Sequence, residues 1–137
     1  METQQDILTD IEESVWYQDA SVGARFLNFI IDFICVIALV VLTLLFVFPE
    51  ISEAGYQLLI YSTFLIYYSL LETATNGRTI GKFVTGTRAV RIDRAEFSGG
   101  NAILRSLCRL VPFDSISALG GSPWHDKWTK TRVVKVR

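Results

Sequence analysis

An aspartate stands inside the longest apolar run of the chain. Residues 26–48 are apolar apart from Asn28, Asp32 and Thr43. A carboxylate near the bilayer centre costs about 2.5 to 3.5 kcal/mol on insertion scales, and somewhat less at Asp32, about 9 Å from the end of the run. Such an acid is either a functional site for a proton or cation, or a carboxylate that pairs helices. The sequence leaves both interpretations open.

Asp32 is the last of three polar residues on one helical stripe. Arg25, Asn28 and Asp32 lie at positions i, i+3 and i+7, which share one face of a helix. Arg25 and Asp32 are about 10.5 Å apart along the axis, and helical side chains lean toward the N-terminus, so the two should not pair directly. The stripe should therefore face protein and find partners on other segments. The predicted partners are Arg105 or Arg109 for Asp32, and Glu72 or Asp126 for Arg25.

Residues 77–82 contain glycines and a lysine in an order similar to a phosphate-binding loop. The spacing between the glycines is one residue short, and Phe83 stands where a Ser or Thr should hold magnesium. The segment is predicted instead to be a tight turn. Its basic residues, Arg78 and Lys82, are expected to anchor it at the membrane interface.

The other residues that could carry chemistry give weaker signals. His125 neighbours Asp126, but no serine or cysteine nucleophile is obvious for them to activate. Cys35 and Cys108 lie far apart, with no second Cys or His at metal-ligand spacing. We therefore expect no enzyme activity, no metal and no cofactor.

Two apolar segments can position the polar stripe. The run 26–48 gives about 35 Å of helix, longer than a hydrocarbon core of about 30 Å, and Pro49 ends it. A second, tyrosine-rich run covers residues 56–71 and reaches about 20 residues with its flanks. Every backbone amide in lipid must be paired within its own segment, so both runs must be helical. We predict a transmembrane hairpin of helices 22–48 and 55–75.

The charges of the chain are divided between its two ends. Residues 1–19 carry six acids and no Lys or Arg, whereas residues 78–137 carry twelve Lys or Arg and four acids. The turn between the helices has no Lys or Arg, which predicts that the turn is outside and both termini are cytoplasmic, in a bacterial inner membrane. The expected partners are anionic lipids and a second copy or another membrane protein, and no nucleic acid.

The rest of the chain is predicted to form three further segments. Residues 1–21 read as an acidic tail, and residues 83–98 as a strand, a turn and a return strand. Residues 101–119 form an amphipathic helix with Arg105 and Arg109 on its basic face, expected to lie in the membrane interface. A third crossing over the same residues is the alternative, and it would bury both arginines.

The predicted fold is therefore an all-α membrane protein. It comprises a transmembrane helical hairpin, a cytoplasmic β-ribbon and a basic amphipathic helix or third span. One membrane domain covers residues 22–134, and residues 135–137 form the C-terminal end.

Several motifs follow one another along residues 20–134. They are Arg25 with Asp32; Glu72, Gly77, Thr79, Gly81, Lys82 and Gly86; Arg105 with Arg109; Trp124-His125-Asp126-Lys127; and Thr131-Arg132-Val133-Val134. Together they resemble the RDD family of small membrane proteins, named for an Arg and two Asp residues, which Arg25, Asp32 and Asp126 fit. The resemblance implies a multi-pass protein, often with a third apolar span. Most members have no assigned activity, and some are linked to cation/proton exchange.

Two functions remain open at this point. The first is proton-coupled exchange of a monovalent cation, with Asp32 as the titrating site in an oligomer, because two helices cannot enclose a pathway. The second is a non-transporting membrane module that docks a protein partner through its polar stripe and its basic face. An exchanger needs Asp32 to be ionisable, whereas a docking module should tolerate Asn at that position.

Overall fold

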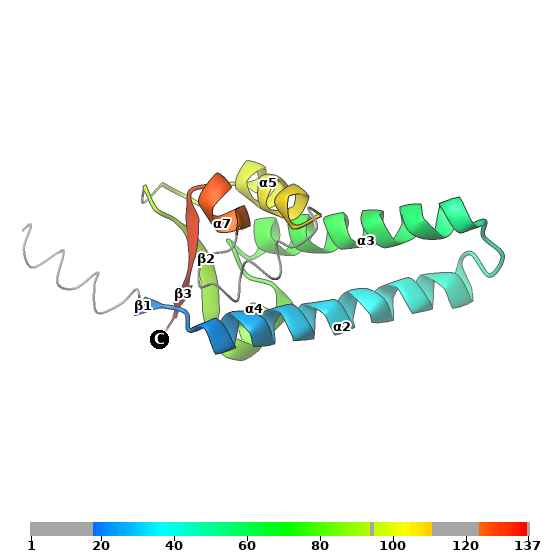
Figure 1. Ribbon diagram of the computed structural model, residues 1–137, viewed down its shortest axis with the longest axis horizontal. Coiled ribbons are helices and arrows are strands. Elements are labelled where there is room, and N and C mark those ends of the chain that lie inside the picture. Colours follow the sequence, from blue (N-terminus) through cyan, green and yellow to red (C-terminus); the bar gives the residue numbers. More distant parts are fainter. Residues whose placement is uncertain (1–17, 94, 111–123, 137) are drawn as a thin grey trace, which may run out of the picture.

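The computed structural model describes residues 18–93, 95–110 and 124–136, and the protein is mostly helical. Figure 1 shows two long antiparallel helices joined by a turn at one end and a small head at the other. The elements, in chain order, are β1 (Gln18–Asp19), α2 (Val22–Phe46), α3 (Glu53–Ala74), α4 (Ile80–Thr85), β2 (Thr87–Arg91), α5 (Gly99–Arg109), α7 (Trp124–Trp128) and β3 (Thr131–Lys135).

Local sequence sets the ends of the two long helices. The hydroxyls of Ser21 and Ser52 accept hydrogen bonds from backbone N–H groups in the first turns of α2 and α3, so α3 begins two residues before the predicted residue 55. Pro49 disfavours the helical conformation in the residue before it, and α2 ends at Phe46 rather than at residue 48. Among the helices that the structure describes, only α2 is both long and apolar enough to count as a membrane span.

The two long helices meet along a narrow apolar seam. Val36 and Val40 of α2 pack with Tyr67 and Tyr68 of α3, and the two tyrosine rings lie edge to face with centroids 5.2 Å apart. The outward faces are apolar as well: Ile34, for example, is 61% exposed. A soluble helix normally buries its apolar stripe and exposes polar residues, and α2 does not.

The described elements of the head are β1, α4, β2, α5, α7 and β3 (Figure 1). Its three strands form an antiparallel sheet with the order β1-β3-β2. The predicted ribbon over residues 83–98 is therefore wrong. The segment starts inside α4, its one strand, β2, pairs with the distant β3, and residues 95–98 have no regular structure. Thr79 caps α4, and Gly86, with φ +65°, ends it in the left-handed conformation. The β-branched residues near Phe83 thus lie in a short helix.

The structure extends the predicted membrane domain, residues 22–134, at both ends. Residues 18–20, expected in the acidic tail, join the sheet, and the Ala20 N–H donates to the Val133 carbonyl over 2.9 Å. Lys135, expected in the C-terminal end, is the last residue of β3. The sheet thus ties both ends of the described chain together, so the fold is not purely helical.

The predicted amphipathic helix over residues 101–119 corresponds to α5. The helix begins earlier, at Gly99, because the Ser98 hydroxyl accepts a hydrogen bond from the Asn101 N–H over 3.4 Å. Residues 111–119 of the prediction lie outside the described residues, as do residues 1–17 of the tail and most of the alternative third crossing.

A glycine allows α4 to lie directly against α2. A Cβ atom built on Gly81 would stand 2.5 Å from the Asn28 carbonyl oxygen, whereas a Cβ on Gly23 would meet nothing within 4 Å. We predict that Gly81→Ala lowers the free energy of unfolding by about 1–3 kcal/mol, because backbone must move to admit the methyl group. The measurement is reversible unfolding in detergent micelles, followed by circular dichroism.

Gly23→Ala is the matched control for this change. It should leave stability within about 1 kcal/mol of wild type, or raise it slightly, because alanine favours a helix over glycine. Equal losses for the two variants would contradict the close approach of α4 to α2.

Candidate functional site

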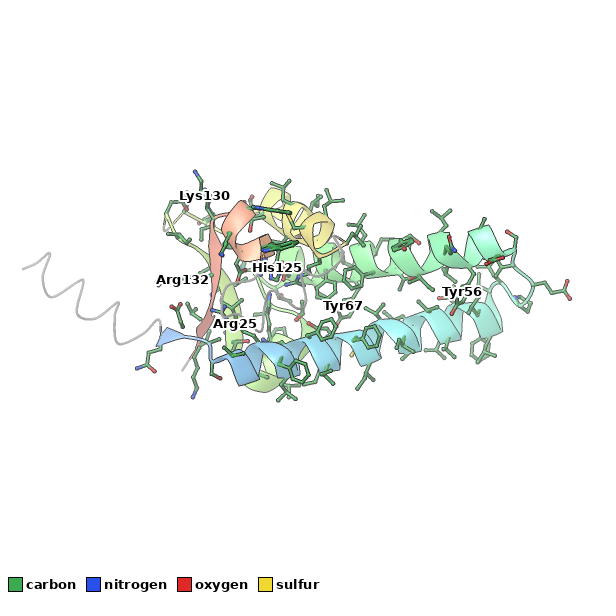
Figure 2. All side chains as sticks on the ribbon, viewed as in Figure 1. Arg25, Tyr56, Tyr67, His125, Lys130 and Arg132 are labelled. Carbon is green, nitrogen blue, oxygen red and sulfur yellow. The ribbon has the colours of Figure 1, made fainter. Side chains whose placement is uncertain are left out.

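Asp32 is held by three donors from two other segments. Its Oδ1 accepts hydrogen bonds from the Tyr67 hydroxyl and the Gly81 N–H, each over 2.8 Å, and its Oδ2 accepts one from the Thr79 hydroxyl over 2.6 Å. The side chain is only 2% exposed. Figure 2 shows Tyr67 reaching from α3 toward α2, where Asp32 lies. These bonds join α2 to α3 and to the start of α4.

The prediction that Arg105 or Arg109 pairs with Asp32 is wrong. Both arginines bind Glu72 instead, and hydroxyl and amide donors take their place at Asp32. A buried carboxylate that accepts several short hydrogen bonds is satisfied without a full counter-charge.

The other members of the polar stripe also face the head. The Asn28 amide hydrogen-bonds with the hydroxyls of Thr85, the last residue of α4, and Thr87, the first residue of β2. Arg25, one turn earlier, is half-buried. The stripe thus faces protein, as predicted from its polarity, and the protein it faces is the same chain.

Glu72, at the C-terminal end of α3, is the centre of a buried charge cluster. Its Oε1 lies 2.6 Å from Lys82 Nζ and 3.2 Å from Arg109 Nη2, and its Oε2 lies 3.1 Å from Arg105 Nε. Glu72 and Arg105 are fully buried, and Lys82 is 3% exposed. Three cations from α4 and α5 therefore meet one carboxylate of α3.

Arg105 extends the cluster to the end of the chain. Its Nη1 donates to Asp126 Oδ1 on α7 over 2.5 Å and to the Thr131 hydroxyl on β3. His125 Nε2 lies 3.5 Å from the same Asp126 oxygen. One guanidinium thus bridges α3, α7 and β3.

The cluster of Glu72, Lys82, Arg105, Arg109 and Asp126 holds three cations and two carboxylates. The positive excess lowers the pKa of the neighbouring His125 and of Lys82 within the cluster. Burial, then the charges of Arg109, Arg105, Lys82 and Arg25, lower the pKa of His125 well below its usual value, so His125 is neutral at pH 7. Burial lowers the pKa of Lys82 to about 8, and although Glu72 opposes this shift, the two arginines add to it.

Three of the four predicted interface anchors belong to this cluster, Lys82 and Arg105 buried and Arg109 12% exposed. Lys82, Arg105 and Arg109 point inward, so the prediction that they anchor the chain in lipid head groups is wrong. The physical reason is Glu72, whose buried charge draws them in. Arg78 is half-buried, and its guanidinium carbon lies 5.3 Å from the centre of the Phe83 ring. The acids predicted to pair with Arg25, Glu72 and Asp126, bind the cluster cations instead.

The sequence analysis gave no site role to the hydroxyl residues Tyr67, Thr79, Thr85 and Thr131, although Thr79 and Thr131 belong to the motifs of the family resemblance. Thr79 could have been predicted as a helix N-cap, since it stands three residues before Lys82 and just after a glycine turn. The residues of the described chain include no group of three His, Cys, Asp or Glu side chains that could hold a metal ion.

α2 is long and apolar enough to cross a membrane and buries its polar residues Asn28 and Asp32, which is typical of a membrane-associated protein. The RDD family profile matches residues 19–130, and the chain belongs to that family. Of the residues that fit the family's three letters, Arg25 and Asp32 lie on α2 and Asp126 lies on α7; Asp32 binds the start of α4, and Asp126 binds Arg105. The comparisons with curated proteins and with solved structures gave no match.

Proposed function

We propose that α2 and α3 both cross the membrane, with the turn between them outside and both termini in the cytoplasm. The turn carries the exposed acid Glu50 and no basic residue, and the exposed Glu53 follows as the first residue of α3. Four exposed basic side chains lie at the other end, on α7, β3 and the turn between them: Lys127, Lys130, Arg132 and Lys135. Figure 2 shows Lys130 and Arg132 at the opposite end of the molecule from Tyr56. Lys and Arg collect on the cytoplasmic side, which supports this orientation.

The polar residues of α3 are compatible with a second span. At 22 residues the helix is about 33 Å long. Its charged residue nearest the head, Glu72, is buried against the head, and Tyr67 and Tyr68 are buried against α2. Lipid would therefore meet mainly apolar residues of α3, such as Leu58, Ile66 and Leu70.

Within this topology, we propose that the protein is a non-transporting module that docks a partner. The observation that carries the proposal is the clamp on Asp32, whose two carboxylate oxygens are already bound by three donors from other segments. A carboxylate that exchanges a proton for a cation needs an oxygen that a cation can reach. Asp32 instead joins three segments, and Glu72, with three cations around it, has the same structural role.

The four exposed basic residues provide the docking surface. They lie on α7, on β3 and in the turn between them, and only Arg132 has a described acidic neighbour, Asp19, at 3.9 Å. A pair so exposed and so distant contributes little, about 0–1 kcal/mol. A cytoplasmic or membrane protein with an acidic surface is the partner that fits this charge.

Asp32→Asn tests the choice between docking module and exchanger. Purified protein in vesicles that contain a pH-sensitive dye should show no proton movement under sodium, lithium or potassium gradients, for wild type and variant alike. The variant should lose about 1–3 kcal/mol of unfolding free energy, because three buried donors lose a carboxylate oxygen as acceptor. A sodium/proton ionophore added to the same vesicles is the positive control. Proton flux in wild type that Asp32→Asn abolishes would establish exchange and overturn the proposal.

The docking surface is tested by crosslinking in native membranes. A photoreactive amino acid at Arg132 should yield a protein adduct that disappears at high salt, and also with Lys130→Glu plus Lys135→Glu. The same photoreactive group at Glu50, in the turn, is the matched control and should not give that adduct. Lipid adducts alone, or an adduct that charge reversal leaves unchanged, would contradict docking of an acidic protein.

A further inference from the structure

Two helices of the head, α4 and α5, bury polar or charged side chains and expose apolar ones, the reverse of helices in a soluble protein. α5 buries Asn101, Ala102, Arg105 and Ser106 and exposes Ile103, Leu104 and Leu107. α4 buries Gly81 and Lys82 and exposes Ile80, Phe83 and Val84, the last of them by 66%. In water, such helices would turn their arginine and lysine side chains outward and their leucine and phenylalanine side chains inward.

α4 and α5 lie at the same level along the hairpin, but each packs against a different one of its two long helices. α5 packs against α3, where Ser106 and Ser69 hydroxyls are 3.1 Å apart and Arg105 reaches Glu72. α4 packs against α2, where the Gly81 N–H reaches Asp32. The bond between Asp32 and Tyr67 shows that these contacts lie at similar heights. Figure 1 shows α5 and α4 on opposite sides of the helical pair.

The part of the hairpin between this level and the turn that joins α2 to α3 is too short to cross a membrane alone. From Asp32 to Phe46, the helical rise of α2 gives about 21 Å, and α3 gives about the same from Glu53 to Tyr67. A hydrocarbon core is about 30 Å thick. A hairpin that crosses it must therefore bring the level of α4 and α5 into the apolar region, or close to its edge.

We infer that the exposed faces of α4 and α5 form an apolar collar that is embedded in the cytoplasmic leaflet and contacts lipid acyl chains. The collar comprises Ile80, Phe83, Val84, Ile103, Leu104 and Leu107. This inference rests on the proposed hairpin topology and adds to it a partner for the head. The charge cluster of Glu72 would then lie below the membrane surface, shielded from acyl chains by the collar.

Lipid fits these faces better than a second copy of the chain. The faces point to opposite sides of the helical pair, so one protein interface cannot cover both, whereas a bilayer surrounds the molecule. The collar also continues the exposed apolar surface of α2, where Phe26 is 50% and Leu27 is 48% exposed.

An aromatic pair marks the edge of the collar. Trp124 and Trp128 on α7 stack with ring centroids 5.9 Å apart, and Trp128 is 60% exposed. α7 packs beside α5 and also carries the exposed Lys127. Tryptophan prefers the level of the lipid head groups, and lysine can extend from there into water, which places α7 at the border of the leaflet.

Spin labels test the collar directly. Phe83→Cys and Leu104→Cys are each labelled in a Cys35→Ser, Cys108→Ser background and reconstituted into phosphatidylethanolamine/phosphatidylglycerol vesicles. Collisions with oxygen, which concentrates in lipid, are compared with collisions with a water-soluble nickel chelate. The oxygen-to-nickel ratio at both positions should be several-fold above the ratio at Arg132→Cys, the water control. It should approach the ratio at Ile37→Cys, the lipid control on α2.

Each alternative gives a different pattern. Nickel access at Phe83 and Leu104, with Ile37 in lipid, would overturn the collar and leave the hairpin topology standing. Protection from both reagents would show that protein, either a second copy or another part of this chain, covers the faces, and would also overturn the collar. Nickel access at Ile37 would overturn the proposed topology and the collar together.

Discussion

The head depends on one buried carboxylate, Glu72, and the three cations that converge on it. A lone carboxylate in this position would be strongly unfavourable, so its charge draws Lys82 from α4 and Arg105 and Arg109 from α5 to the end of α3. Arg105 then reaches Asp126, which brings α7 and β3 into the same structure. Among the described elements of the head, all except β1 and β2 are thus connected to Glu72 by at most two polar contacts.

Asp32 makes the second set of connections, from α2 to α3 and α4. Together the two carboxylates turn the polar groups of the head inward and leave its apolar side chains outside. This arrangement suits a protein surrounded by lipid, where helices gain little from burying apolar surface and polar contacts inside the bundle help to hold them together. The same contacts argue for a structural rather than a transporting role of Asp32.

The sequence could predict the long helices, the inward-facing stripe and the family, because each depends on local pattern or on residue order. It could not predict which strand pairs with β2, because β3 lies some 40 residues later in the chain. Nor could it assign the arginines of α5. The helical wheel separates Arg105 and Arg109 from the apolar residues, but the same pattern fits a basic face toward head groups or toward a buried acid. The partner, Glu72, decides between the two, and only the fold places it there.

Reversible unfolding of Glu72→Gln in mixed detergent micelles, beside wild type and Lys82→Met, tests this account most directly. Glu72→Gln should lose about 3–5 kcal/mol of unfolding free energy, because it leaves three buried cations without their central acid. Lys82→Met should lose much less, because the two arginines still neutralise Glu72 and the positive excess of the cluster disappears. A loss for Glu72→Gln below about 1 kcal/mol, or equal losses for both variants, would contradict the central role of Glu72.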